Sequence, residues 1–410
     1  MKVLMFGWEF PPFNSGGLGT ACYGLTKGLH KHDVQVTFVL PKADPSLKAE
    51  FVKIVPSEFV HLGKVIKIKS LVTGYMDSKE YENEYSKKYK MYKGSKKDFI
   101  YGKDLFEEVN RYAKSAGDIA RFEEHDIIHA HDWMTYLAGI EARKASKKHL
   151  VVHVHATEFD MTGDHPNQYI YDIERKGLHE ADKIIAVSQF TKNKVIQHYR
   201  IHPDKIEVVH NAVEHSKHEF NDDQFKIKDK DKVVLFLGRV TIQKGPDYFV
   251  YAAKKALEVD PNIKFIIAGD GDMAPFIIEK AAQMGIADKV LFTGFLRGPD
   301  IDKAYQMADL YVMPSVSEPF GITPLEAMKN KTPVLISRQS GVSEVISHCL
   351  KVDFWDVNEL ANKIVSVLRY DELKDSLAEN GSTEVKKFNW DIPAERCLDI
   401  YKRTIGGIYG

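Results

Sequence analysis

Cysteine is scarce in this chain of 410 residues, and the three that occur, Cys22, Cys349 and Cys397, are far apart. An odd and widely spaced set provides neither a disulfide framework nor the paired spacing of a zinc site. So few cysteines are typical of a protein from a reducing compartment. We therefore expect a cytoplasmic location.

Long apolar runs and an excess of charge are missing as well. No run approaches the roughly 20 apolar residues of a membrane helix, and the first residues form a strand-like segment rather than a signal peptide. The 57 basic and 58 acidic side chains leave a net charge of −1, so nothing draws the protein towards nucleic acid or a membrane surface. The hydrophobic content of 44% is that of an ordinary globular protein.

What the sequence does contain is an alternation of short apolar runs and helix-like segments. Such continuous runs are typical of parallel strands that are buried on both faces. The strands expected in the first half are residues 3–6, 35–40, 126–130, 149–154 and 183–187. Those expected in the second half are residues 233–237, 264–268, 290–292, 310–313 and 333–337.

The alternation is interrupted by a charged stretch, residues 216–232, that contains few apolar residues. We therefore expect an α/β protein made of two doubly wound, Rossmann-like domains that face each other across a cleft. The predicted first domain is residues 1–215 and the predicted second domain is residues 216–390. Residues 391–410 contain an amphipathic helix that could pack against either domain, including back across to the first.

A stretch rich in tyrosine and lysine, residues 75–103, stands outside this pattern. The interpretation that we favour is a solvated insertion in the first domain. An acceptor-binding platform is the alternative, because aromatic faces suit sugar rings.

Two cations follow the first strand of the second half. Arg239 and Lys244 lie between Gly238 and Gly245, where a strand becomes a helix. An arginine fork and a lysine point charge both suit the oxygens of a diphosphate. Two exposed loop cations are the ordinary alternative, but the glycine on each side of the segment favours a binding role.

Two carboxylates, Glu318 and Glu326, follow a later strand of the same half. Thr323 is expected to cap a helix and Pro324 to begin it, so that the first amides of this helix would face an anion. Glu318 is well placed to accept hydrogen bonds from sugar hydroxyls. Glu326 has an alternative role, because Thr-Pro-Leu-Glu is a capping-box pattern in which the glutamate bonds back to the helix start.

A glycine turn, Gly16-Gly17-Leu18, follows the first strand of the chain. Glycines let a backbone approach a phosphate closely, and the helix start behind them supplies free N–H groups. A simple tight turn is the alternative. The motif is not G-x-G-x-x-G, which argues against a nicotinamide dinucleotide enzyme.

Histidines gather around two neighbouring strands of the first half, at positions 125, 129, 131, 153 and 155. The segment His129-Ala130-His131-Asp132 leaves a metal site as one interpretation. We favour buried, hydrogen-bonded rings instead and predict no metal. His155 ends its strand, so it is expected at the cleft.

Several of these segments, in this order, resemble the retaining GT-B glycosyltransferases, the group that contains the glycogen, starch and sucrose-phosphate synthases. The resemblance covers nearly the whole chain. The segments that carry it are Gly16-Gly17-Leu18, His129-Ala130-His131-Asp132-Trp133, Val154-His155, Asn211-Ala212-Val213, Gly238-Arg239…Lys244-Gly245 and Glu318…Glu326. The opening segment Gly7-Trp8-Glu9-Phe10-Pro11-Pro12 is most similar to the glycogen synthases.

The resemblance implies a role for each matched position. Arg239 and Lys244 would bind the donor diphosphate and stabilise the leaving group. Glu318 would contact the donor sugar, Glu326 the ribose, and His155 would lie near the reacting sugar. The other donor-binding positions that it implies are Gly16, Gly17, Leu18, Asp132, Gly238, Leu296, Phe320, Gly321, Ile322 and Thr323. No cofactor or metal is implied beyond the nucleotide sugar itself.

The function that the resemblance implies is transfer of a hexose, glucose in the glycogen-synthase-like interpretation, from a nucleoside-diphosphate sugar to a glycan. Ser15 stands where bacterial glycogen synthases usually carry a lysine. This difference favours a UDP- or GDP-sugar, with a cell-surface polysaccharide or a small molecule as acceptor. Three rival functions share parts of the pattern: a sugar-nucleotide epimerase, a phosphorylase and an inactive glucan-binding protein.

Overall fold

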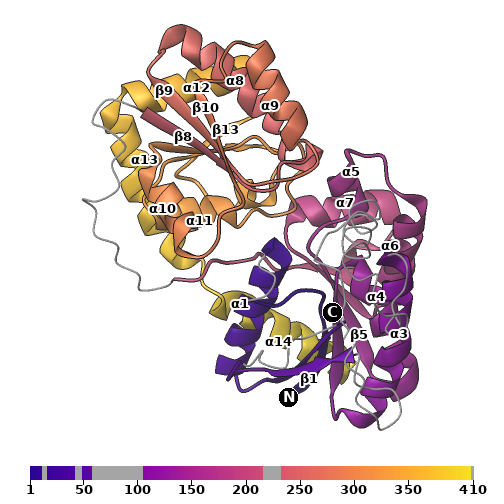
Figure 1. The fold of residues 1–410 in the computed structure, drawn as a ribbon. Helices are drawn as coiled ribbons and strands as arrows, with labels where there is room; N and C mark the ends of the chain where they lie inside the picture. The colour runs from indigo at the N-terminus through magenta and orange to yellow at the C-terminus, as the bar shows by residue number, and fades with distance from the viewer. Residues whose placement is uncertain (12–15, 42–48, 58–104, 216–231, 408–410) are drawn as a thin grey trace, which may run out of the picture.

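The structure is a computed structural model, and it describes residues 1–11, 16–41, 49–57, 105–215 and 232–407. It contains two α/β units, each built on one sheet (Figure 1). Ser15, the stretch rich in tyrosine and lysine and all but the last residue of the charged stretch lie outside the described residues. In the part of the chain that is described, no helix is both long and apolar enough to cross a membrane.

The first sheet has the strand order β3-β2-β1-β4-β5-β6-β7, and every neighbouring pair is parallel. Its strands are β1 (Lys2–Phe6), β2 (Gln35–Leu40), β3 (Lys53–Pro56), β4 (Ile127–His131), β5 (His149–Val154), β6 (Lys183–Ala186) and β7 (Ile206–Val208). β4 and β6 are buried along their whole length, as expected for strands covered on both faces.

Helices cover both faces of this sheet, with α3, α4 and α6 on one side and α1 on the other (Figure 1). The helices of the first domain are α1 (Gly17–Lys31), α3 (Leu105–Phe122), α4 (Trp133–Ser146), α5 (Glu158–Thr162), α6 (Gln168–Glu180), α7 (Gln189–Tyr199) and the short η2 (Pro203–Lys205). This arrangement is the doubly wound fold expected from the sequence.

The second sheet has the order β10-β9-β8-β11-β12-β13 and is also parallel throughout. Its strands are β8 (Lys232–Leu237), β9 (Ile263–Ala268), β10 (Val290–Gly294), β11 (Leu310–Met313), β12 (Val334–Ser337) and β13 (Leu350–Val352). The helices around it are η3 (Ile242–Lys244), α8 (Pro246–Val259), α9 (Ala274–Gln283), α10 (Pro299–Met307), α11 (Thr323–Lys329), η4 (Gly341–Glu344), α12 (Val357–Arg369), α13 (Asp371–Glu384) and η5 (Val385–Lys387).

The last helix, α14 (Asp391–Gly406), returns to the first domain and lies beside α1 (Figure 1). Ala394, Cys397 and Ile400 are buried in the hydrophobic core that the first sheet shares with α1. The hydroxyl of Tyr401 lies 2.7 Å from Nδ1 of His129 on β4. Of the two domains against which the sequence allowed this helix to pack, it therefore packs against the first.

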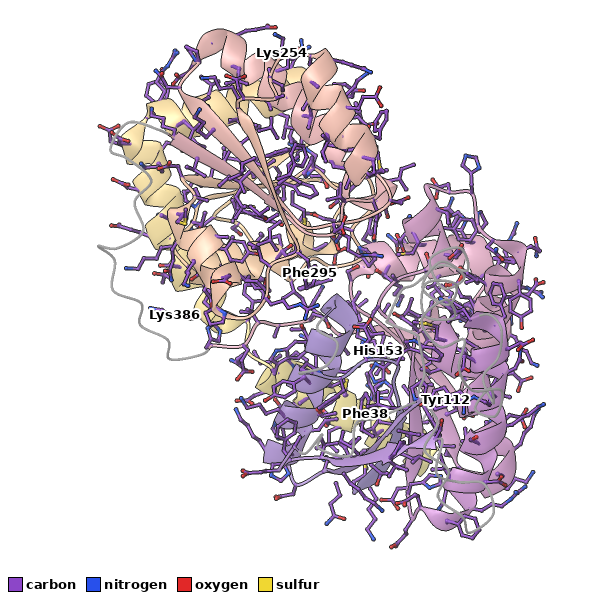
Figure 2. All side chains as sticks on the ribbon, in the orientation of Figure 1. Phe38, Tyr112, His153, Lys254, Phe295 and Lys386 are labelled. Atoms are coloured by element: carbon purple, nitrogen blue, oxygen red, sulfur yellow. The ribbon has the colours of Figure 1, made fainter. Side chains whose placement is uncertain are left out.

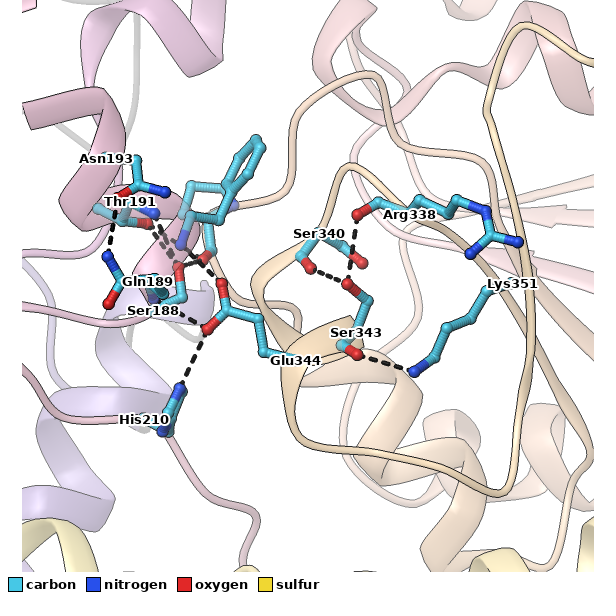
Figure 3. Close-up of polar contacts among 12 residues, drawn as sticks. Ser188, Gln189, Thr191, Asn193, His210, Arg338, Ser340, Ser343, Glu344 and Lys351 are labelled. Carbon is cyan, nitrogen blue, oxygen red and sulfur yellow. Dashed lines mark hydrogen bonds and ion pairs between the residues drawn. The ribbon is translucent and has the colours of Figure 1, made fainter. Parts of the chain in front are cut away.

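The two domains meet where η4 approaches the start of α7 (Figure 3). One oxygen of Glu344 accepts a hydrogen bond from the amide of Gln189 at 2.9 Å, and the other accepts one from the amide of Phe190 at 2.6 Å. His210 Nε2 lies 3.2 Å from the same carboxylate. Glu344 thus satisfies first-turn amides that have no partner within their own helix, and it sits at the positive end of the helix dipole.

A second contact between the domains involves Pro319 of the second domain. The hydroxyls of Ser188 and Thr191, in and just before α7, lie 2.5 and 3.1 Å from the carbonyl oxygen of Pro319. Gly341 permits this approach, because a Cβ there would lie 2.2 Å from that oxygen and 2.5 Å from Cβ of Ser188. Pro319 directly follows Glu318, so the contact ties the segment that carries Glu318 to the first domain.

We predict that Glu344→Ala lowers the free energy of unfolding by about 1–3 kcal/mol at pH 7, because charged hydrogen bonds to two amides are lost. Partial burial acts to raise the pKa of Glu344, but the hydrogen bonds from His210 and the two amides outweigh it, and the pKa lies below 4.5. A carboxylate with a lowered pKa stabilises the fold above its unfolded-state pKa and loses that effect as the pH falls through the folded value. Urea unfolding should therefore show a smaller difference in the free energy of unfolding between the natural protein and Glu344→Ala below pH 4.5 than at pH 7.

The control variant is Glu379→Ala. Glu379 is exposed on α13, and its side chain makes no polar contact with the described residues. A loss of stability equal to that of Glu344→Ala would contradict the prediction.

Candidate functional site in the cleft between the domains

A cleft of about 370 Å³ opens between the two domains. It lies beyond the carboxyl ends of β1 and β5 on one side and of β8, β9 and β11 on the other, where open parallel sheets bind their ligands. Phe295, labelled in Figure 2, stands at its edge on the second domain. The predicted site residues that line the cleft are Gly16, Gly17, Leu18, His155, Gly238, Arg239, Lys244, Leu296, Glu318, Phe320, Gly321, Ile322, Thr323 and Glu326.

Arg239 reaches across the cleft from the loop after β8. Its Nη2 donates a hydrogen bond to the side-chain oxygen of Gln243 at 2.9 Å and lies 3.5 Å from the sulfur of Met161 in the first domain. The backbone of Gln243 is itself fixed, because its main-chain carbonyl oxygen accepts a hydrogen bond from the amide of Val316. The guanidinium is therefore held in the cleft by both domains.

Lys244 and Glu318 form an ion pair, with 2.5 Å between Nζ and Oε2. The hydroxyl of Ser315 lies 3.1 Å from the same oxygen. The side chains are only 20% and 8% exposed, so both charges have lost most of their contact with water. The attraction between them compensates for that loss. An ammonium group carries three donors, and Lys244 can therefore bind an anion in the cleft while it keeps Glu318.

The helix after β11 begins differently from the prediction. α11 starts at Thr323, with Ile322 at the N-cap position and no side-chain cap. The expected N-cap role of Thr323 is therefore wrong: its hydroxyl lies 2.8 Å from that of Tyr311 instead. Among the described residues, the amides of Gly321, Ile322 and Thr323 are not used in any hydrogen bond, and all three residues line the cleft.

Glu326 does not form the capping box that the sequence left as an alternative. Its carboxylate accepts a hydrogen bond from the hydroxyl of Tyr305 at 3.1 Å and lines the cleft. Burial raises the pKa of Glu326, and the hydrogen bond from Tyr305 acts in the opposite direction. The side chain is thus available to a ligand rather than to its own helix.

His155 enters the cleft at the end of β5, and its Nε2 lies 2.9 Å from Nδ1 of His131. Burial lowers the pKa of His155 to about 3. The ring is therefore neutral at pH 7, which suits a hydrogen bond to a neutral hydroxyl group better than the binding of a phosphate.

Asp132 does not line the cleft, contrary to the predicted donor contact. It is fully buried behind His155, and its Oδ1 accepts hydrogen bonds from the amides of His155 at 2.7 Å and Ala156 at 3.3 Å. Its backbone has φ 59° and ψ 171°, a conformation essentially restricted to glycine that costs of order 1–3 kcal/mol. Asp132 positions the segment that carries His155 instead of touching a ligand.

Glu9 also lines the cleft, although it was not among the predicted site residues and only its place in a family-like segment pointed to it. It is 3% exposed, and its Oε2 has no hydrogen-bond partner within the described ranges. Burial raises the pKa of Glu9, while the amides of Gly19 and Gly16 and the charge of Arg239 act to lower it. Gly16 lies directly against this carboxylate, since a Cβ there would be 2.7 Å from Oε2 of Glu9 and would make the side chain move. A carboxylate thus faces the cations across the cleft.

Comparison with known proteins agrees with the fold. Residues 15–217 match the model of Glycosyltransferase Family 4, and residues 217–384 match that of Glycosyl transferases group 1. Together with a relative of 30% identity, described next, these matches show that the chain belongs to the glycosyltransferases and is an enzyme that transfers sugars.

Particular relatives span the whole chain. The uncharacterized glycosyltransferase MJ1607 of Methanocaldococcus jannaschii is 30% identical and covers 98% of both chains. The sucrose-phosphate synthase of Thermosynechococcus elongatus has a TM-score of 0.74 at 17% identity, over 99% of each chain. Anabaena Alr3699/HepE, solved in complex with UDP and glucose, has a TM-score of 0.66 at 18% identity, over 98% of this chain and 99% of that one. The two solved structures confirm the expected GT-B fold.

We predict that Asp132→Ala lowers the free energy of unfolding by about 2–4 kcal/mol, because two amides lose their acceptor and the strained backbone loses its compensation. Sugar transfer should fall at least tenfold. Asp132→Asn should keep most of both properties, since it retains an oxygen acceptor for the two amides on a side chain of the same shape. Urea unfolding and turnover of donor measure the two effects.

The matched control is Asp126→Ala. Asp126 accepts a hydrogen bond from the amide of Lys2 at 2.8 Å, at the end of β4 away from the cleft. This variant should lose stability but not transfer. Equal losses of transfer in the two alanine variants would contradict a positioning role for Asp132.

We predict that Glu9→Gln makes stability less dependent on pH. A carboxylate with a raised pKa costs stability as the pH rises above its unfolded value of 4.5 and through its folded value. The stability of Glu9→Gln relative to the natural protein should therefore increase with pH above 4.5 and then become constant. Urea unfolding between pH 4 and pH 8 tests this, with the exposed Glu379→Gln as control. A difference that does not change with pH would contradict it.

Proposed function

We propose that this enzyme transfers a hexosyl group from a nucleoside-diphosphate sugar to a hydroxyl acceptor, with retention of configuration. The observation that carries the proposal is the pair of cations, Arg239 and Lys244, held beside Glu318 at the carboxyl ends of the second sheet. The HepE complex with UDP and glucose supports a nucleotide-sugar donor in the same fold. Glucose is the sugar that we favour.

In the proposed mechanism, the bond between C1 of the sugar and the diphosphate oxygen breaks. Negative charge then grows on the diphosphate, and Arg239 and Lys244 stabilise it from fixed positions, so that no divalent metal is needed there. The acceptor oxygen bonds to C1 on the face that the diphosphate leaves, and its proton passes to the departing phosphate. The configuration at C1 is therefore retained.

The remaining lining residues fit the parts of such a donor. Glu318 accepts hydrogen bonds from sugar hydroxyls while its charge is balanced by Lys244. Glu326, which lines the cleft, would accept a hydrogen bond from the ribose. Leu296 and the 58% exposed Phe295 offer an apolar surface to the base.

The neutral ring of His155 faces the sugar from the first domain. Because burial lowers the pKa of His155 to about 3, the ring adds no positive charge beside C1 as the sugar itself becomes cationic. We propose that it donates to or accepts from a sugar hydroxyl and so orients the reacting carbon.

A screen of thermal unfolding with UDP, ADP and GDP and their glucose and mannose conjugates identifies the donor, since a ligand that binds the folded state raises its melting temperature. A UDP- or GDP-sugar with a polysaccharide or small-molecule acceptor is the alternative to a glycogen-synthase-like reaction.

Two further outcomes distinguish the rival functions. Release of free sugar from the donor would exclude an inactive glucan-binding protein. Conversion of the donor into a new sugar nucleotide without acceptor would indicate an epimerase.

We predict that Arg239→Ala and Lys244→Ala each lower turnover about 10²–10³-fold, the usual effect of removing one group that stabilises a developing charge. Far-UV circular dichroism should remain native in both. Lys244→Ala should also be the less stable variant, because Glu318 is left buried and unpaired. Steady-state kinetics with the donor from the screen provides the measurement, and NMR of the product reports the configuration at C1.

The control is Lys255→Ala, which removes an exposed cation from α8 in the same part of the chain. Near-normal turnover in both cleft variants would overturn the assigned roles.

A further inference from the structure

Four histidines lie side by side on one face of the first sheet, directly behind the cleft. His129 and His131 alternate along β4, His153 lies in β5 with His155 directly after its end, and His131 is paired in register with His153. Their ring centroids are 4.2 Å apart within each of these two pairs along the chain and 5.2 Å apart between His131 and His153. All four rings are buried. Figure 2 labels His153, which lies inside the first domain.

The hydrogen bonds of this histidine cluster leave most of its nitrogens unused. Nδ1 of His129 bonds to the hydroxyl of Tyr401, and Nδ1 of His131 bonds to Nε2 of His155. Within the described part of the chain, the nitrogens without a partner are Nε2 of His129, Nε2 of His131, both nitrogens of His153 and Nδ1 of His155. A buried polar atom without a partner costs about 1–3 kcal/mol, so five of them in one place require an explanation.

For His129 and His131, the pattern of bonded and unbonded nitrogens is the one that metal ligands show. A histidine that binds a metal through one ring nitrogen usually has the other fixed by a hydrogen bond, which sets its tautomer and orientation. Tyr401 and His155 do this for His129 and His131, and both rings present Nε2. Ligand atoms of His129, His131 and His153 lie within 4.8 Å of one another. Zinc binds nitrogen at 2.0–2.1 Å, which puts its ligands roughly 3.4 Å apart. The rings of His129 and His153 are stacked within 7° of parallel, so binding one ion requires them to turn until their nitrogens converge.

A further possible ligand lies beside the cluster. The thiol of Cys22 is within 4.8 Å of the ligand atoms of His131 and His155, and thiol sulfur and imidazole nitrogen are both ligands that zinc accepts.

We propose that His129, His131 and His153 bind one divalent transition metal ion of the zinc class. The ion is structural: it joins β4 and β5, and through Tyr401 it is linked to α14. It replaces our sequence-based preference for hydrogen-bonded rings without a metal, because the structure leaves these rings largely without hydrogen bonds. The proposal does not depend on the identity of the sugar donor, since His129, His131 and His153 do not line the cleft in which Arg239 and Lys244 are proposed to bind the diphosphate.

The test uses the full chain, stripped of metal with a chelator and titrated with Zn²⁺ and with Co²⁺ as a coloured probe. We expect one ion per chain, visible absorption bands of tetrahedral Co²⁺ and a higher melting temperature with Zn²⁺. Absorption fine structure at the zinc edge should show nitrogen ligands at about 2.0–2.1 Å with the outer-shell scattering of imidazole. No stoichiometric binding, or bound zinc without imidazole scattering, would overturn the proposal.

His153→Phe is the decisive variant, because neither nitrogen of His153 has a partner among the described residues. The replacement keeps a flat ring and removes no hydrogen bond, so without metal it should unfold at the same temperature as the natural protein or higher. Its affinity for Co²⁺ should fall at least about 100-fold, and Zn²⁺ should no longer stabilise it. Undiminished binding in this variant would overturn the site.

Two further variants separate the site from general effects. Tyr401→Phe removes only the hydrogen bond that orients His129, and it should weaken Co²⁺ binding by about 10–100-fold. His125→Gln should leave binding unchanged, because both nitrogens of His125 already have partners, Glu123 and Ser146. Loss of binding in His125→Gln would mean that the metal lies elsewhere.

Discussion

The direction of the strands is the constraint on which the rest of this structure depends. Every neighbouring pair in both sheets is parallel, so all carboxyl ends within a sheet lie at one edge. The carboxyl ends of the strands of one sheet face those of the other, and the loops that follow these strands line a single cleft. Gly16, His155, Arg239 and Glu318 are far apart in the chain and meet only for this reason.

Within the cleft, the ion pair of Lys244 and Glu318 holds a cation and a carboxylate side by side in a largely buried position. A lone buried lysine would be costly, and a lone buried glutamate equally so. Paired, the two side chains are held in place before any ligand arrives, and each still has hydrogen-bonding capacity to spare. Glu9 and Glu326 complete a site in which fixed cations face fixed carboxylates, an arrangement that suits the donor we propose, a charged leaving group joined to a sugar rich in hydroxyls.

The fold could be predicted from the sequence where burial leaves a simple trace. All ten expected strands are present, with ends within two residues of the prediction, because strands covered on both faces must be apolar throughout. The short strands β3, β7 and β13 were not predicted, since three or four partly exposed residues carry too little pattern.

The location of the site and most of its residues could be predicted from the sequence, but the contacts that these residues make could not. Residues that follow strands could be expected at the cleft, and all of the candidates except Asp132 line it. The positive φ of Asp132 and the use of Thr323 and Glu326 by tyrosine hydroxyls depend on groups brought together by the fold. The contact of Glu344 with Gln189 joins residues 155 positions apart, which no local pattern reveals.

The return of α14 to the first domain has a consequence for how the protein is made. Ala394, Cys397, Ile400 and Tyr401 belong to the core of the domain that contains β1, yet they are translated after the whole second sheet. The first domain to leave the ribosome therefore cannot complete its interior until almost the entire chain has been synthesised. The face of α1 that α14 covers therefore remains exposed to water during that interval.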